Sequence, residues 1–183
     1  MSVSEKERIY IIDDIVISLP EEKCEELMGG FHPGFVYDPD YPSETHQRFV
    51  SRLNTYIGAH IAEAGRDCEV FLTPFAVFLD ADNYIEPDLS VVCNKNRLSD
   101  RGCEGAPDWV IEITSLSTQN DDYMTKLFQY RSIGVRLYWV VDPEKQTVNV
   151  WDFEREGYAQ YSFSDPIPVS IWEGFVMHMD DIM

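Results

Sequence analysis

The sequence is short of basic residues. It has 14 lysines and arginines against 33 aspartates and glutamates, which gives a formal net charge of −19. Because like charges repel, this balance opposes long-range attraction to a polyanion such as DNA, and nucleic-acid binders usually carry a basic surface. A nucleic-acid function would therefore depend on local basic residues or on metal ions.

Long apolar runs are also missing. No segment approaches the roughly 18 to 20 apolar residues that would span a membrane. The first residues, MSVSEKERIYIIDD, lack the basic-then-apolar layout of a signal peptide. We therefore expect no membrane association and a cytoplasmic location.

Cysteine is scarce, and the four cysteines lie far apart, at Cys24, Cys68, Cys93 and Cys103. The absence of a CxxC or Cys/His cluster excludes a recognisable zinc site, so we expect reduced, structural thiols. A hydrolase that uses Ser or Cys has little support, because the sequence has no GxSxG motif and no Cys/His pair of recognisable spacing.

What the chain does have is enough apolar residues for a core. At 183 residues, with 44% hydrophobic residues, we expect one folded domain of mixed α/β (α+β) class. Within it we expect an N-terminal arm and short helix over 1–30, a core over 43–153, and C-terminal strands and loops over 154–183. The core pattern predicts helices from Ser43 to about Ile61 and from Thr118 to Gly134. It also predicts a strand or a bent pair of strands over 68–80, and strands at 87–93, 108–114, 135–142 and 147–153.

Two acids stand where predicted strands could present them. Glu112 interrupts the apolar strand DWVIEIT, and a buried carboxylate costs several kcal/mol unless it is paired or bound to metal. Asp108 lies on the same strand roughly 13 Å away at about 3.3 Å per residue, too far to share one ion with Glu112. Asp88, at the start of a separate strand, can converge on Glu112.

Asp88 and Glu112 would supply hard oxygen ligands suited to Mg²⁺ or Mn²⁺, which can activate a water as nucleophile. Lys126, on the predicted helix after Glu112, could reach over the sheet toward that acid and stabilise developing phosphorane charge. An exposed salt bridge to Asp122 explains the same lysine equally simply.

Other polar residues are candidates of lower rank. Accessory site residues would come from two helices: Glu44, His46, Gln47 and Gln129. Contacts to a phosphate backbone would come from five basic residues, for which ordinary solvent exposure is the alternative: Arg48, Arg52, Lys95, Arg97 and Arg101.

The segments that hold these residues resemble those of a known family. The runs PDLSVV, GAPDWVIEITSLST and GVRLYWVVD, with Lys126 four residues before Tyr130, closely resemble the Uma2 family of restriction-endonuclease-like proteins. Weaker similarity lies in EELMGGF and SETHQRFVSRL. The resemblance covers about Glu25 to Phe153.

The resemblance implies a PD-(D/E)xK nuclease fold, with a mixed central sheet flanked by helices and a catalytic acid from each of two neighbouring strands. It makes Asp88 the PD aspartate and Glu112 the second acid. The usual lysine position, two residues after that acid, holds Thr114 here, and the resemblance assigns the lysine's role to Lys126.

Two functional classes follow. The first is a metal-dependent endonuclease that hydrolyses DNA, with dimerisation expected because a double-strand cut needs two sites. The second is a non-catalytic binding or assembly protein on the same scaffold, in which Asp88 and Glu112 pair structurally with Lys126. The net charge of −19 favours the second class.

Overall fold

The computed structural model of the protein describes residues 7–12, 15–20, 42–114 and 120–182. The chain divides into two compact units, Met1–Tyr41 and Pro42–Met183. The short helix predicted within 1–30 and the predicted start of the second helix at Thr118 lie outside the described residues. The assignment of the whole chain to one domain stays a prediction.

The described part of the first unit is an antiparallel hairpin. It pairs β1 (Glu7–Ile12) with β2 (Ile15–Pro20), in a register that sets Ile12 opposite Ile15. The sequence predicts an N-terminal arm in this part of the chain, and the structure has two strands there.

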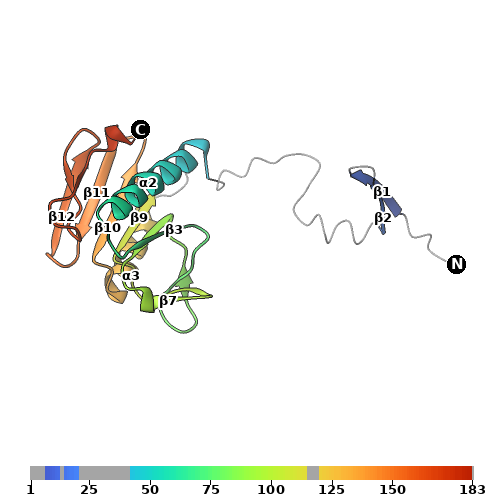
Figure 1. Ribbon diagram of the computed structural model, residues 1–183, viewed down its shortest axis with the longest axis horizontal. Coiled ribbons are helices and arrows are strands. Elements are labelled where there is room, and N and C mark those ends of the chain that lie inside the picture. Colours follow the sequence, from blue (N-terminus) through green and yellow to red (C-terminus); the bar gives the residue numbers. More distant parts are fainter. Residues whose placement is uncertain (1–6, 13–14, 21–41, 115–119, 183) are drawn as a thin grey trace. The chain divides into compact units, whose positions relative to one another are not determined.

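A six-stranded mixed sheet forms the centre of the second unit (Figure 1). The pair β9–β10 is parallel, and the other neighbours are antiparallel. In spatial order the strands are β12 (Gly157–Ser162), β11 (Thr147–Asp152), β10 (Leu137–Asp142), β9 (Trp109–Ile113), β6 (Leu89–Val92) and β3 (Glu69–Leu72). This arrangement confirms the predicted fold class.

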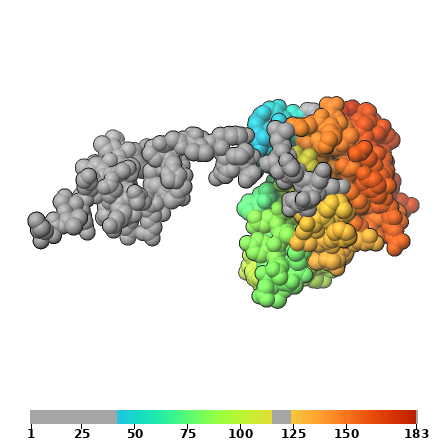
Figure 2. Space-filling view, turned by 180° about the vertical axis from the view of Figure 1, so that it is seen from behind, coloured from blue at the N-terminus to red at the C-terminus, as the bar shows by residue number. Residues whose placement is uncertain are grey.

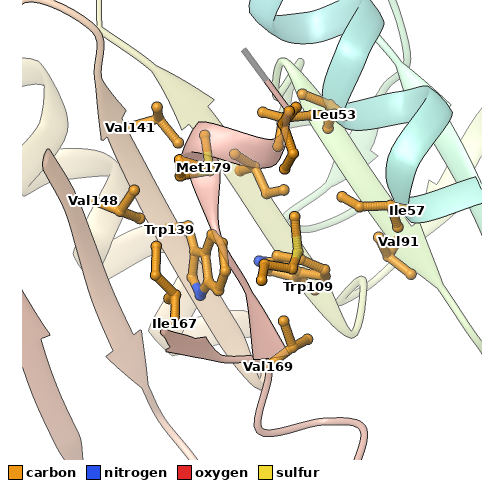
Figure 3. Packing of buried hydrophobic residues seen from close by; sticks show 14 of the residues in the cluster. Leu53, Ile57, Val91, Trp109, Trp139, Val141, Val148, Ile167, Val169 and Met179 are labelled. Atoms are coloured by element: carbon orange, nitrogen blue, oxygen red, sulfur yellow. The ribbon is translucent and has the colours of Figure 1, made fainter. Parts of the chain in front are cut away.

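One face of the sheet packs on α2 (Glu44–Glu63). Ser43 caps this helix, since its hydroxyl accepts a hydrogen bond from the His46 backbone N–H at 3.1 Å. Figure 3 shows Leu53 and Ile57 of α2 facing Trp109 and Val91 of the sheet. The apolar stripe predicted from Ser43 onward is therefore the core face of the helix.

The opposite face of the sheet packs on α3 (Asn120–Ile133). Tyr130 of this helix and Val110, Tyr138 and Val140 of the sheet form a second buried cluster. Gly134 follows the helix with φ 94°, a left-handed conformation that glycine adopts without strain. Successive side chains of a strand point to opposite faces of the sheet. In β9, Val110 and Glu112 therefore face α3, and Trp109, Ile111 and Ile113 face α2.

A smaller four-stranded sheet and short C-terminal elements complete the unit. The small sheet has the order β5 (Tyr84–Ile85), β4 (Val77–Phe78), β8 (Gly102–Glu104) and β7 (Leu98–Ser99). The 3-10 helix η1 (Lys95–Arg97) lies directly before β7 in the chain. In Figure 2 the green segment that holds this sheet lies at the lower left, beside the yellow and orange parts of the same unit. The C-terminal elements are β13 (Ile167–Pro168), β14 (Val176–Met177) and η2 (Met179–Asp181).

The prediction of reduced thiols is wrong for two cysteines. Cys68 and Cys93 form a disulfide. They flank the antiparallel pair β3–β6, whose register sets Glu69 opposite Val92 and therefore Cys68 opposite Cys93. Cys103 is a buried free thiol, and burial raises its pKa to about 11. Cys24 lies outside the described residues, and the cytoplasmic location stays a prediction.

This disulfide should stabilise the second unit. It closes a loop over a sequence separation of 25 residues, and a loop of that size corresponds to about 3.5 kcal/mol of unfolding free energy. We expect reductant to lower the melting temperature of the wild-type protein, measured by calorimetry. The doubly substituted Cys68→Ser, Cys93→Ser protein should melt at the same temperature with and without reductant. An equal response of both proteins would contradict the assignment.

No helix in the described parts of the chain has the length and apolarity that crossing a membrane requires.

Candidate active site

The sheet register brings two carboxylates together. Leu89 of β6 lies opposite Ile111 of β9, so the same register, extended by one residue, sets Asp88 opposite Glu112. Directly opposite residues of an antiparallel pair have Cβ atoms about 4.5–5.5 Å apart on one face. The Asp88 side chain is also held to β9, because its Oδ2 accepts a hydrogen bond from the Ile113 N–H at 2.8 Å.

Glu112 is 9% exposed, and α3 supplies both of its side-chain partners. Lys126 Nζ lies 3.1 Å from Glu112 Oε2, and the Tyr130 hydroxyl donates to Oε1 at 2.6 Å. Lys126 itself is partly buried, with 26% of its side chain exposed. The helix thus presents a cation and a hydroxyl to the one carboxylate within strand β9.

The electrostatics of Glu112 follow from this burial. Desolvation raises its pKa to about 7, and the nearby Asp88 carboxylate acts in the same direction. Lys126 and the Tyr130 hydrogen bond oppose the rise without cancelling it. Burial and the neighbouring Glu112 likewise raise the pKa of Tyr130 well above its usual value. A second positive charge near Glu112 would therefore stabilise the ionised form of this carboxylate, which burial disfavours.

Tyr130 was not among the residues predicted for the site. An aromatic residue at its position on the helix is typical of the core, and its ring is indeed fully buried. The signal was its spacing, because residues four apart share a helix face and Lys126 was already a candidate.

Asp108, the other acid of a PD pair, has a separate structural position. Its Oδ2 accepts a hydrogen bond from the Cys93 N–H at 2.8 Å, and its Oδ1 lies 3.0 Å from Arg136 NH1. These contacts tie the start of β9 to the end of β6 and to the segment before β10. The expectation from strand spacing, that Asp108 does not pair with Glu112, agrees with this geometry.

The substitution Asp108→Asn should therefore lower stability and spare metal binding. Weakening two partly buried hydrogen bonds, one of them to a charged group, should cost about 2–3 kcal/mol of unfolding free energy. Urea denaturation measures the loss, and a Mn²⁺ titration of the folded variant should give the wild-type affinity. Loss of Mn²⁺ binding by the folded protein would return Asp108 to the candidate ligands.

The candidate accessory residues divide into near and distant ones. His46 is buried, and its Nε2 lies 3.0 Å from Asp88 Oδ2. Glu44 is exposed and pairs with Arg48 one turn along α2. Gln47 is exposed, and Gln129 is half-buried on α3. Of these four, only His46 has a described contact with one of the predicted acids.

The five candidate phosphate contacts all have partners within the protein. Arg48 pairs with Glu44, and Arg52 donates to the Ile182 carbonyl at 3.2 Å. Lys95 lies 2.6 Å from Asp67 and 3.4 Å from Glu69. Arg97 donates to the Ala106 carbonyl, and the Arg101 guanidinium lies 4.2 Å from the centre of the Phe78 ring. A role in phosphate binding would compete with these contacts.

The donor set fits a hard divalent cation that keeps several waters. Mg²⁺ is typically bound through one or two carboxylates, with waters and substrate oxygens filling the remaining positions. Asp88 Oδ1 accepts no hydrogen bond from the described residues, so it is available to an ion. Glu112 would exchange part of its contact with Lys126 for the ion. Within the described residues, no three His, Cys, Asp or Glu side chains converge as a metal cluster.

A mixed sheet with a helix on each face is the fold expected of a restriction-endonuclease-like protein. The comparison with family models agrees. The chain belongs to the Uma2 family, described as "Putative restriction endonuclease", whose model matches residues 30–178. The family resemblance predicted from the sequence is confirmed, and the match extends beyond Phe153 into the C-terminal strands.

A solved structure has the same fold. It is the crystal structure of "a putative nuclease belonging to DUF820 from Anabaena variabilis ATCC 29413", with a TM-score of 0.64 and 20% sequence identity. The alignment covers 100% of this chain and 92% of that chain. No curated protein matches this chain.

Proposed function

We propose that this protein is a metal-dependent endonuclease that hydrolyses phosphodiester bonds of DNA, with Mg²⁺ or Mn²⁺ as its cofactor. The observation that carries the proposal is the register of β6 and β9, which pairs Asp88 with Glu112 beside Lys126. Membership in a family described as restriction endonucleases supports the same chemistry.

Each residue of the site has a distinct role in this proposal. Asp88 and Glu112 would hold the ion through carboxylate oxygens. When bound, the ion supplies Lewis acidity and lowers the pKa of an attacking water. Lys126 places a positive charge where negative charge develops on the scissile phosphate. Tyr130 holds the Glu112 carboxylate at the base of the site through its hydrogen bond of 2.6 Å.

The acidity of the chain shapes how DNA would be bound. With a formal net charge of −19, the protein must offset repulsion of the phosphates locally, and a divalent ion together with Lys126 would do this at the site itself. We expect weak affinity without the metal. Binding should depend on the divalent ion more than on a broad basic surface.

Cleavage of DNA tests the proposal. Supercoiled plasmid and a labelled single strand are incubated with the protein in Mg²⁺, in Mn²⁺ and in excess chelator. Nicking or linearisation should require the metal and disappear with Asp88→Asn, while Glu63→Gln, an exposed acid of α2, should leave it unchanged. Cleavage that survives in Asp88→Asn would contradict the proposal, and so would failure of the wild type with both metals.

One observation favours the alternative of a non-catalytic binding or assembly protein. Both oxygens of Glu112 already have partners in Lys126 and Tyr130, as expected of a structurally paired acid. Calorimetry separates the two functions, because a structurally paired site should bind no divalent metal. Tight Mn²⁺ binding that is lost with Asp88→Ala would exclude the alternative. The homodimer expected from a double-strand cut stays a prediction.

A further inference from the structure

Besides its hydrogen bond with β9, the Asp88 carboxylate has a contact with a residue of α2. His46 Nε2 lies 3.0 Å from Asp88 Oδ2, and the histidine side chain is 8% exposed. The same Oδ2 accepts the hydrogen bond from the Ile113 N–H at 2.8 Å. Two nitrogen groups therefore converge on one carboxylate oxygen, while Oδ1 accepts no hydrogen bond from the described residues.

The position of His46 is itself fixed. Its backbone N–H donates to the Ser43 hydroxyl at 3.1 Å, which is the N-cap contact of α2. The ring is buried, and its Nδ1 has no hydrogen-bond partner within the described residues. Among the described residues, the His46 ring thus makes its polar contact through Nε2, with Asp88. Because a buried polar atom without a hydrogen-bond partner destabilises the folded state, the contact of Nε2 with Asp88 is needed to offset the cost of the unpaired Nδ1.

We propose that His46 is the positioning residue for Asp88: its Nε2–H and the Ile113 N–H together hold Oδ2, so that Asp88 binds the cation through Oδ1 alone. The inference rests on the proposed function, since it assigns a geometry to the same metal site. His46 does not touch the metal or the substrate. It acts by fixing the rotamer of the aspartate, as hydrogen-bond partners of metal-binding carboxylates commonly do.

The assignment makes a specific demand on the imidazole. Nε2 must carry the proton that is donated to Oδ2, because a carboxylate oxygen can only accept. A proton on Nδ1 would be buried without an acceptor among the described residues. The Nε2–H tautomer is the form that both ends of the ring favour.

Two substitutions of different reach test the role. In Gln the amide nitrogen takes nearly the place of Nε2, whereas in Asn it takes that of Nδ1 and falls short of Asp88. With Mn²⁺ binding followed by electron paramagnetic resonance, His46→Gln should stay within about threefold of the wild-type affinity. His46→Asn should bind about 10- to 100-fold more weakly, the usual loss when a supporting partner of a ligand is removed.

The outcomes separate this inference from the function on which it rests. If the wild type does not bind Mn²⁺, the proposed metal site is wrong and the inference falls with it. If the wild type binds and His46→Asn binds equally well, only the positioning role is overturned. Equal losses of melting temperature in both variants with unchanged affinity would likewise reduce His46 to a packing residue.

A measurement on the wild-type protein covers the case in which His46→Asn does not fold. In ¹H–¹⁵N spectra of the histidine side chains, the His46 resonances are the set that disappears in His46→Gln. We expect the Nε2–H tautomer, with a signal that shifts in Asp88→Asn. An Nδ1–H tautomer, or a signal that is indifferent to Asp88, would overturn the inference.

Discussion

Glu112→Gln should abolish metal-dependent cleavage, lowering the rate at least 10³-fold, and should weaken Mn²⁺ binding to the same protein. The amide keeps the size of the side chain but removes the negative charge and one of the oxygens that a hard cation requires. Single-turnover cleavage of plasmid DNA and a calorimetric Mn²⁺ titration measure the two effects. Glu63→Gln provides the control, because it makes the same chemical change at an exposed position of α2.

The same variant tests the electrostatics of the site without a metal. The pKa of Glu112 is raised from 4.5 to about 7 in the folded protein, so the carboxylate destabilises the fold increasingly as pH rises between those values. The unfolding free energy of the wild type, relative to Glu112→Gln, should therefore fall by on the order of 3 kcal/mol between pH 4.5 and pH 7.5. A difference that is constant over this range would mean that Glu112 is not held in a desolvating environment.

The cleavage assay has its own contradicting outcome. Robust DNA cleavage by Glu112→Gln would mean that Glu112 is not a residue of the active site.

Lys126→Met should reduce cleavage about 10²- to 10³-fold while changing Mn²⁺ affinity less than tenfold. In our account the lysine stabilises charge that develops during the reaction, and removal of one such group typically costs this much in rate. Its loss leaves Glu112 available to the cation, so the metal site should persist. Single-turnover rates at saturating Mn²⁺ measure the effect on the chemical step.

Lys145→Met is the matched control for this variant. Lys145 is 77% exposed and pairs with Asp142 three residues earlier, outside the proposed site. Its substitution should leave both cleavage and metal affinity unchanged. If Lys126→Met lost Mn²⁺ binding together with activity, the lysine would be maintaining the architecture of the site, and its role in charge stabilisation would be wrong.

Much of the geometry of the candidate site could be predicted because it depends on local rules. A carboxylate within the apolar strand WVIEI indicates a paired or metal-bound group wherever the strand lies. The spacing of Asp108 and Glu112 along one strand excludes their convergence without knowledge of the fold. The choice of Asp88 then required only that its strand neighbour that of Glu112, and the β6–β9 register provides this.

The parts that were missed depend on how separate elements come together. The sequence wrongly predicts reduced thiols at Cys68 and Cys93, because their disulfide depends on the register between β3 and β6, which neither strand reveals by itself. Tyr130 has the pattern of a core residue, and only the position of α3 over β9 turns its hydroxyl toward Glu112.

The basic candidates show the same limit. The charges of Lys95 and Arg101 were evident from the sequence. Their partners were not, because Asp67, Glu69 and the Phe78 ring belong to other segments that the fold brings alongside them.

The most direct test of the account is anomalous diffraction from crystals soaked with Mn²⁺. We expect one manganese peak between Asp88 and Glu112, with Asp88 Oδ1 and a Glu112 oxygen each about 2.1–2.2 Å from the ion and Lys126 displaced from that oxygen. Crystals at saturating Mn²⁺ with no peak there, and with Glu112 still bound to Lys126 and Tyr130, would contradict the metal site. Such a result would favour the alternative, a non-catalytic binding or assembly protein in which these residues pair structurally.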